Sequence, residues 1–242
     1  MSKFSFVNKN SIQNNKFFLD QDESHHLINV LRLKLGSEIW LTDGEGGTYH
    51  CKTDNFTKEN VVEGHILDSY SNQNELDYHI HLGLPIIKKS RMKIAIEKSV
   101  ESGIKELTPL ILDRSIKSSL SVEKINSIMR SATKQSMRSI LPKTNPISEL
   151  EDWYNPEALN IVASIGSVDT LTVFKDKIYE AVDSKKKISI LLGPEGGFSS
   201  EEKEFIYDNK FLKVSVAKAV LRSETAVVSI LSILNEVMVQ YE

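Results

Sequence analysis

Residues 188–202 read ISILLGPEGGFSSEE, an apolar run followed by three glycines and a polar segment that opens like a helix. A strand, a glycine turn and a helix start in this order can hold a ligand on free backbone amides. No Lys-Ser/Thr pair follows the glycines and the spacing is not G-x-G-x-x-G, so the phosphate-binding motifs fail. Glu195 would repel a phosphate, and Ser199 with Glu202 predicts a capping box that occupies the free amides. The stretch therefore favours a neutral or cationic ligand such as a nucleoside, with a purely structural turn as the alternative.

The chain around this stretch alternates strands with helices from Tyr78 onward, which predicts an α/β domain with a mostly parallel sheet. The first 70 residues instead show short strands separated by turns, which predicts a small β-barrel with one helix over 24–32. The polar stretch 69–74 is the expected linker, so we expect domains at 1–72 and 73–242. The second domain is expected to have strands at 79–85, 106–112, 160–165, 187–192 and 212–216, and helices at 90–102, 122–141, 171–183, 200–207 and 224–241.

The composition is that of a globular protein, with 242 residues, 40% apolar residues and a net charge of -3. No window approaches the 18 uncharged apolar residues that cross a bilayer, and the first residues lack a signal-peptide core, so we expect no membrane association and a cytoplasmic protein. Cys51 is the only cysteine, which excludes an internal disulfide and a multi-cysteine metal site. We expect this thiol to be buried, and no metal to be bound.

The charge is unevenly distributed, because residues 85–146 hold 13 lysines and arginines against 5 acidic residues while both flanks are acidic. Such a basic belt indicates a polyanionic partner, with a pair of solvated lysine-rich helices as the alternative. Arg130, Lys134 and Arg138 are four residues apart and would line one face of the expected helix, a spacing suited to a phosphate backbone. Gln135 and Arg138 could also reach a base edge.

A second segment, VLRSETA at 220–226, precedes a long apolar helix. Ser223 or Thr225 is expected to cap that helix, and Glu224 suits its first turn. Arg222 stands at the electrostatically unfavourable end of this helix, because a helix amino terminus repels a cation. A partner such as Glu224, or a ligand, should therefore hold the Arg222 guanidinium.

Five separated segments together resemble the bacterial 16S ribosomal RNA (uracil-N3)-methyltransferases of the SPOUT superfamily. The segments are HHLINVLRLKLG at 25–36, EKSVESGIKELTPLILDRS at 97–115, ATKQSMR at 132–138, LLGPEGGFSSEE at 191–202 and VLRSETA at 220–226. The resemblance implies a trefoil-knotted parallel sheet with helices on both faces, preceded by a PUA-like β-barrel that binds RNA. It also implies a homodimer that uses S-adenosyl-L-methionine to methylate N3 of a uridine in 16S ribosomal RNA of the small subunit. Because N3 is paired in a duplex, we expect the target in non-canonical or assembled RNA, and the sequence does not distinguish free RNA from an assembled subunit.

The cofactor residues below follow from this resemblance, whereas the roles of Arg222 and Glu224 follow from the chemistry of the reaction and the RNA contacts from the basic belt. Arg222 would stabilise the uracil anion formed when N3 loses its proton, and Glu224 would orient Arg222 or take that proton. The residues expected to bind the cofactor are Ala163, Ser164, Ile165, Leu192, Gly193, Glu195, Gly197, Val216, Ala217, Leu221, Thr225 and Ala226. The residues expected to contact RNA are Arg32, Arg91, Lys98, Arg114, Arg130, Lys134, Gln135 and Arg138, with Gln135 and Arg138 supplied by the second subunit.

The chain departs from the family pattern at 216–219, where Val-Ala-Lys-Ala stands in place of Leu-Gly-x-Arg. The Ala217 methyl group narrows the approach of a ligand to the backbone and disfavours a positive φ, so we expect weaker cofactor binding than is usual in the family. Ala217 and Ala219 also support a rival hypothesis, a non-catalytic RNA-binding module that has lost its cofactor. A nucleotide-dependent enzyme is disfavoured by the failed phosphate motifs.

Overall fold

The computed structural model describes residues 3–116 and 121–241, and the chain divides into two compact units. The first unit takes the chain up to Glu75 together with Thr133–Leu141. The second unit takes Leu76–Ala132 and the chain from Pro142 onward. Thr133–Leu141 therefore belongs to the first unit, although it is distant in sequence. The expected division into residues 1–72 and 73–242 places this segment in the second domain.

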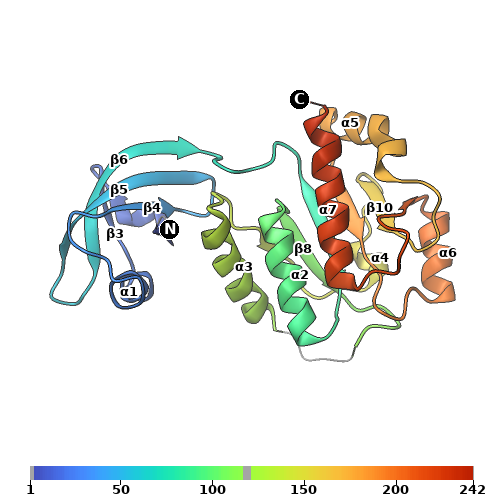
Figure 1. Cartoon of the computed structure of the whole chain (residues 1–242), viewed down its shortest axis with the longest axis horizontal. Coiled ribbons are helices and arrows are strands. Elements are labelled where there is room, and N and C mark those ends of the chain that lie inside the picture. The colour runs from blue at the N-terminus through green and yellow to red at the C-terminus, as the bar shows by residue number, and fades with distance from the viewer. Residues whose placement is uncertain (1–2, 117–120, 242) are drawn as a thin grey trace. The chain divides into compact units, whose positions relative to one another are not determined.

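The first unit is built on a six-stranded sheet in the order β1-β4-β5-β6-β3-β2 (Figure 1). Its strands are β1 (Phe4–Phe6), β2 (Ile12–Gln13), β3 (Lys16–Phe18), β4 (Glu38–Thr42), β5 (Gly47–Phe56) and β6 (Val62–Ser71). All pairings are antiparallel except β1 with β4. Because β6 continues through Ser71, the linker expected at 69–74 is partly strand.

Two short helical segments take the place of the single helix expected over 24–32. They are α1 (Gln21–His25), capped by the Asp20 side chain, and a π-helical turn over His26–Val30. Leu27 in that turn packs into the core between the strands. Cys51 is also fully buried there, and its burial raises the pKa of the thiol to about 12, which confirms the expected buried cysteine.

The second unit holds a six-stranded sheet in the order β12-β10-β11-β7-β8-β9, in which every pairing is parallel. Its strands are β7 (Ile80–Pro85), β8 (Glu106–Leu110), β9 (Lys143–Thr144), β10 (Leu159–Ala163), β11 (Ile188–Leu191) and β12 (Leu212–Val214). Every residue of β7, β8 and β11 is buried, as expected for a parallel sheet covered on both faces. The predicted parallel α/β domain is confirmed.

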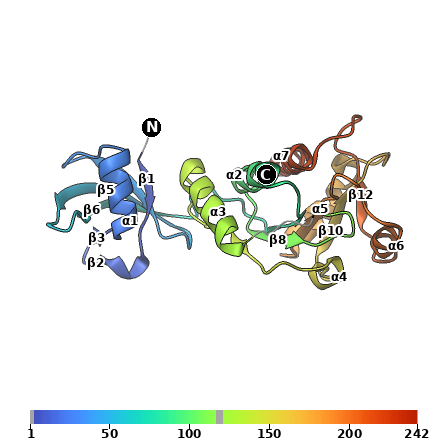
Figure 2. The ribbon, with the colours of Figure 1, turned by 90° about the horizontal axis from the view of Figure 1, so that it is seen from below.

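Helices cover both faces of this sheet, with α2 and α7 packed together on one side and α4 on the other (Figure 2). The helical segments are α2 (Lys89–Glu101), α3 (Val122–Ser136), α4 (Leu150–Trp153), a 3-10 turn (Leu171–Phe174), α5 (Lys175–Asp183), α6 (Ser200–Asp208) and α7 (Ser223–Val239). None of the helices within the described residues is long and apolar enough to cross a membrane.

Helix α3 ends at Ser136 rather than continuing to residue 141, and this changes the expected basic stripe. Met137 takes a left-handed backbone with φ of 56°. The amides of Met137 and Arg138 donate to the carbonyls of Lys134 and Thr133, which is the Schellman pattern that closes a helix. Arg138 therefore lies beyond the helix and does not extend a stripe from Arg130 through Lys134.

Candidate active site

A cavity of about 300 Å³ lies outside the carboxyl ends of β10, β11 and β12. The segments that leave these three neighbouring parallel strands meet there: Ala163–Ile165 after β10, the glycine loop after β11 and Val216–Leu221 after β12. Ligands of open α/β sheets bind at this kind of position, because the loops after parallel strands emerge at the same edge. The volume suits a ligand of small-molecule size.

The structure brings together eleven of the twelve residues expected to bind a cofactor. They are Ala163, Ser164, Ile165, Leu192, Gly193, Glu195, Gly197, Val216, Ala217, Leu221 and Ala226. Thr225 does not line the cavity and is exposed on α7. Ala217 is not among the residues with positive φ, so its methyl group narrows the cavity without straining the backbone. The lining residues not predicted for the cofactor are Arg114, Pro194, Gly196, Phe198, Lys203, Ala219, Val220 and Ser223.

The glycine loop leads into α6 through the expected capping box. The Ser199 hydroxyl accepts from the Glu202 amide at 3.2 Å, and the Glu202 carboxylate accepts from the Ser199 amide at 2.8 Å. The other oxygen of Glu202 accepts from the Asp113 amide at 2.8 Å, which ties the loop after β8 to the same helix end. The amides at this helix start are therefore engaged by side chains, as predicted, and are not left for a phosphate.

The start of α7 is fastened to the glycine loop by Ser223. Its hydroxyl donates to the Gly193 carbonyl oxygen at 3.2 Å. Helix α7 has no side-chain cap, so the expectation that Ser223 or Thr225 caps it is wrong. The Ser223 hydroxyl binds the carbonyl of Gly193, which follows β11, and not an amide at the start of the helix.

Glu195 and Glu224 approach the same guanidinium from different loops. Arg91 Nη1 lies 3.0 Å from Glu195 Oε1, and Arg91 Nε lies 3.7 Å from Glu224 Oε1. The second oxygen of Glu224 is buried and has no hydrogen-bond partner among the residues that the structure describes. Arg91, expected from sequence to contact RNA, is thus engaged by two carboxylates of the cavity region.

Arg222 is exposed, and no described residue forms a hydrogen bond or ion pair with its side chain. Glu224, the partner expected for it, faces Arg91 instead. Arg222 does not line the cavity itself, but its neighbours Leu221 and Ser223 do.

The remaining residues expected to contact RNA fall into separate environments. Arg114 donates to the Gly196 carbonyl oxygen at 2.8 Å and so braces the glycine loop. Arg138 is 2% exposed, and its guanidinium binds both oxygens of Glu75. Arg32 and Gln135 are exposed, and Arg130 is partly buried. Lys98 pairs with Glu101 and Lys134 with Glu23.

A larger hollow of about 600 Å³ lies near the ends of β7 and β8, and its rim is acidic. The carboxylates among its lining residues are Asp113, Glu149, Glu151, Glu201 and Glu202. RNA binding relies on neutralising phosphates with cations, so this hollow is unsuited to an RNA strand.

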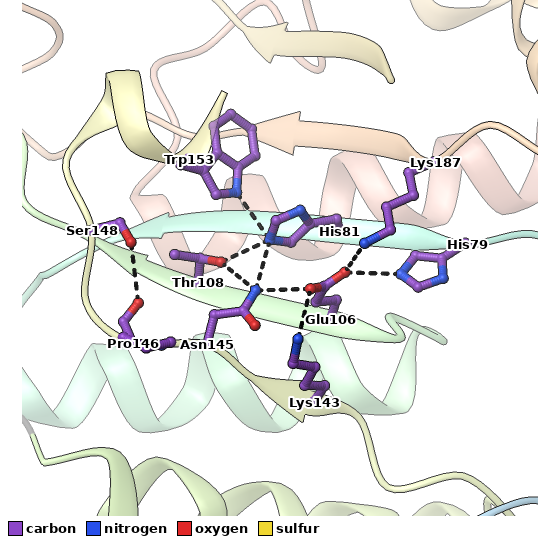
Figure 3. Close-up of polar contacts among 10 residues, drawn as sticks. All are labelled: His79, His81, Glu106, Thr108, Lys143, Asn145, Pro146, Ser148, Trp153 and Lys187. Carbon is purple, nitrogen blue, oxygen red and sulfur yellow. Dashed lines mark hydrogen bonds and ion pairs between the residues drawn. The ribbon is translucent and has the colours of Figure 1, made fainter. Parts of the chain in front are cut away.

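A polar cluster lies at the amino ends of the strands, opposite the cavity (Figure 3). His81 Nε2 accepts from Trp153 Nε1 at 3.0 Å and from the Thr108 hydroxyl at 2.7 Å, and burial lowers the pKa of this imidazole to about 4. Glu106 contacts His79, Lys143, Lys187 and Asn145, and the His79 contact leads the causes that lower its pKa. The described residues hold no group of three or more His, Cys, Asp or Glu that could bind a metal.

A parallel sheet with a cavity at its carboxyl edge, closed by a glycine loop, defines an α/β domain that binds a small ligand at its strand ends. Residues 74–235 match the family model of an RNA methyltransferase domain, and residues 19–52 match that of an RNA methyltransferase PUA domain. The chain belongs to this RNA methyltransferase family, which confirms the resemblance seen in the sequence.

Individual relatives agree along most of the chain. A ribosomal RNA small subunit methyltransferase E of Buchnera aphidicola is 27% identical over 222 residues, covering 88% of this chain and 85% of its own length. The protein of the same name from Aquifex aeolicus is 28% identical, covering 91% and 94%. The crystal structure of a ribosomal RNA small subunit methyltransferase E from Neisseria gonorrhoeae, bound to S-adenosyl methionine, is 25% identical, covers 98% of both chains and superposes with a TM-score of 0.83.

Proposed function

We propose that this protein uses S-adenosyl-L-methionine to methylate N3 of a uridine in 16S ribosomal RNA of the small subunit. The observation that carries the proposal is the meeting of GPEGG and VLRSETA around one cavity in a member of an RNA methyltransferase family. The lining suits this cofactor, because it offers small and apolar residues for a nucleoside but no phosphate motif. Its charged residues, Glu195 on one hand and Arg114 and Lys203 on the other, carry both signs, as do the charged groups of the cofactor's methionine part.

The cofactor supplies the methyl group, and the chain's residues must prepare the acceptor. Uracil N3 carries a proton in the neutral base, so its removal leaves negative charge on the ring. Arg222 stabilises this charge electrostatically, since its guanidinium is exposed beside the cavity and is not held by another described side chain. Glu224 is the candidate proton acceptor, because one of its oxygens is buried without a partner.

The uridine must be unstacked for N3 to be reached, so the substrate region is non-duplex RNA. We take the assembled small subunit as the substrate and free 16S RNA as the alternative. Arg32 and Lys98 supply phosphate contacts, joined by Arg130, Lys134 and Gln135. The affinity for RNA then falls steeply as salt rises, because bound phosphates release counterions. An RNA affinity that is the same at low and moderate salt would contradict this interface.

Several finer features complete the proposal. The loops after β11 and β12 form a trefoil knot, the first unit closes into a PUA-like barrel, and two copies of the chain form a homodimer in which Gln135 faces the partner's pocket. Arg138, which was expected there too, is buried against Glu75 and is left out of this proposal. The protein works in the cytoplasm, where ribosomal subunits are assembled. These features are supported by the family resemblance and by the meeting of GPEGG and VLRSETA at one cavity.

Calorimetric titration with S-adenosyl-L-methionine tests the pocket and separates the enzyme from its rival, the non-catalytic RNA-binding module. The proposal predicts one saturable site per chain. It also predicts weaker binding by Leu221→Trp, a variant that fills part of the cavity with a larger side chain, while the exposed control Lys124→Met binds normally. Absence of binding at millimolar cofactor would favour the RNA-binding module.

A further inference from the structure

Arg91 stands at the beginning of α2, where a cation is electrostatically disfavoured. The first turn of this helix contains no acidic residue, and Lys88, Lys89 and Arg91 are all basic. The amides at a helix start carry partial positive charge, so three cations there require compensating anions. Glu195 and Glu224 provide these anions from the glycine loop and from the start of α7.

The two ion pairs of Arg91 are partly shielded from water, which makes their geometry specific. The side chains of Arg91, Glu195 and Glu224 are 26%, 29% and 12% exposed. Ion pairs at such positions are screened less by solvent than fully exposed pairs. A planar guanidinium can also face two carboxylates at once, which the point charge of a lysine does less well.

Both carboxylates belong to segments that shape the cavity, although Arg91 does not line it. Glu195 lies within the loop of Gly193–Gly197, and Glu224 follows directly after Ser223, which binds the Gly193 carbonyl. The Arg91 guanidinium therefore joins the same two segments as Ser223, at a second point. The two contacts together fix the spacing between the glycine loop and the start of α7.

We propose that Arg91 is a positioning residue for the cofactor pocket, which orients Glu195 and Glu224 and holds the glycine loop against α7. This inference rests on the proposed function, because it takes the cavity to be the cofactor site. It assigns to Arg91 a role in cofactor binding rather than the RNA contact expected from the sequence.

The test compares Arg91→Met with Lys89→Met, which removes the same charge from the same helix turn at an exposed residue. Calorimetry with S-adenosylmethionine and with S-adenosylhomocysteine gives the cofactor affinities, and filter binding gives the affinity for 16S RNA. Arg91→Met is expected to raise both cofactor Kd values about tenfold, a change of about 1.4 kcal/mol. S-adenosylmethionine carries a positive charge on its sulfur and S-adenosylhomocysteine does not. If the affinities for both ligands fall together, the variant has changed the position of the loop rather than the charge near the sulfur. RNA affinity should match that of Lys89→Met.

Glu195→Gln keeps the size of the side chain but removes its ion pair with Arg91, and it tests the same contact if Arg91→Met fails to fold. Because Glu195 also lines the cavity, the ligand compared in this variant is S-adenosylhomocysteine, which has no cationic sulfur. The double variant is expected to lose no more affinity for S-adenosylhomocysteine than the weaker-binding single variant, since Glu195→Gln removes one of the two contacts that Arg91→Met removes. Cofactor Kd values equal to those of Lys89→Met would overturn the proposal, as would a loss confined to RNA affinity. Absence of cofactor binding by the wild-type chain would overturn the proposed function, and this inference with it.

Discussion

The Ser223 hydroxyl donates a hydrogen bond of 3.2 Å to the carbonyl oxygen of Gly193. This contact joins the first residue of α7 to the first residue of the glycine loop, which are 30 residues apart in the chain. Ser223 is buried, so the Gly193 carbonyl has little access to a replacement partner from solvent. The two sequence motifs are thus one structural unit.

Ser223→Ala should therefore lower the free energy of unfolding by about 1 kcal/mol, the usual net value of one hydrogen bond. Cofactor affinity should fall with it, because the loop is then less firmly held at Gly193. Chemical denaturation and calorimetry measure the two effects. Ser229→Ala, on the same helix and partly exposed, is the matched control. If Ser223→Ala bound cofactor like that control, the coupling of the two motifs would be refuted.

The pair of Arg138 and Glu75 makes a different prediction, about stability. Both side chains are nearly inaccessible, at 3% and 2% exposure, and Glu75 also accepts from the Ile140 amide at 2.9 Å. Arg138→Met would leave a buried carboxylate without its cation, so the free energy of unfolding should fall by about 3–5 kcal/mol. The exposed Lys124→Met should be nearly neutral in the same urea titration.

A second variant separates the charge from the packing. In Arg138→Met with Glu75→Gln no buried charge is left, and the amide oxygen can still accept from Ile140. Part of the lost stability should return. Wild-type stability in Arg138→Met would show that the side chain is free for RNA contact, contrary to the structure.

The imidazole of His81 predicts a loss of stability in acid. Burial lowers its pKa to about 4 from a usual 6.5, so the folded state resists protonation that the unfolded state accepts. The stabilisation is complete above pH 6.5 and is lost as the pH falls from about 6.5 to about 4, by roughly 3 kcal/mol over that window. The pKa of Glu106 is lowered too, so its contribution is also lost on acidification.

His81→Gln isolates this effect, since glutamine is neutral throughout and can accept from Trp153. Its free energy of unfolding should vary less between pH 6.5 and 4 than that of the wild-type chain. A slope for His81→Gln as steep as that of the wild-type chain would rule out His81 as the source.

Gly197 predicts a pure backbone effect in the glycine loop. Its φ is +69°, and a Cβ built on it would meet no atom within 4 Å. Gly197→Ala should therefore cost about 1 kcal/mol of stability through left-handed strain alone, whereas Gly197→Asn should cost less, because asparagine tolerates this conformation. Thermal unfolding of the two variants compares them, and equal losses would indicate a steric cause instead.

The sequence predicted most of the structural features that are set by residues close together in the chain. The parallel α/β domain, the capping box of Ser199 and Glu202 and eleven of the cavity residues follow from local patterns and from the resemblance. The hairpin of β2 and β3 had a usable signal in Asn14–Asn15, both of which take positive φ, but its strands of two and three residues are too short to show a period.

Long-range pairings were not predictable in the same way. Arg138 finds Glu75 across 63 residues, and Arg91 finds Glu195 across 104. The charge pattern along a sequence does not reveal which carboxylate lies near a given basic residue in the folded chain. A lysine or arginine among other basic residues is therefore interpreted as exposed to solvent. The end of α3 was missed for a related reason, since Met137 adopts a left-handed backbone usually taken by glycine.

The reaction proposed for this chain is methylation of N3 of a uridine in small-subunit ribosomal RNA. The most direct measurement is mass spectrometry of 16S RNA from small subunits lacking the modification, after incubation with the protein and S-adenosyl-L-methionine. We expect one 3-methyluridine per RNA with the wild-type chain and full activity with Lys124→Ala. With Arg222→Ala the rate should fall by at least tenfold, which corresponds to a transition-state effect of about 1.4 kcal/mol. Unmodified uridine after incubation with the wild-type chain, or modification by Arg222→Ala at the wild-type rate, would contradict it.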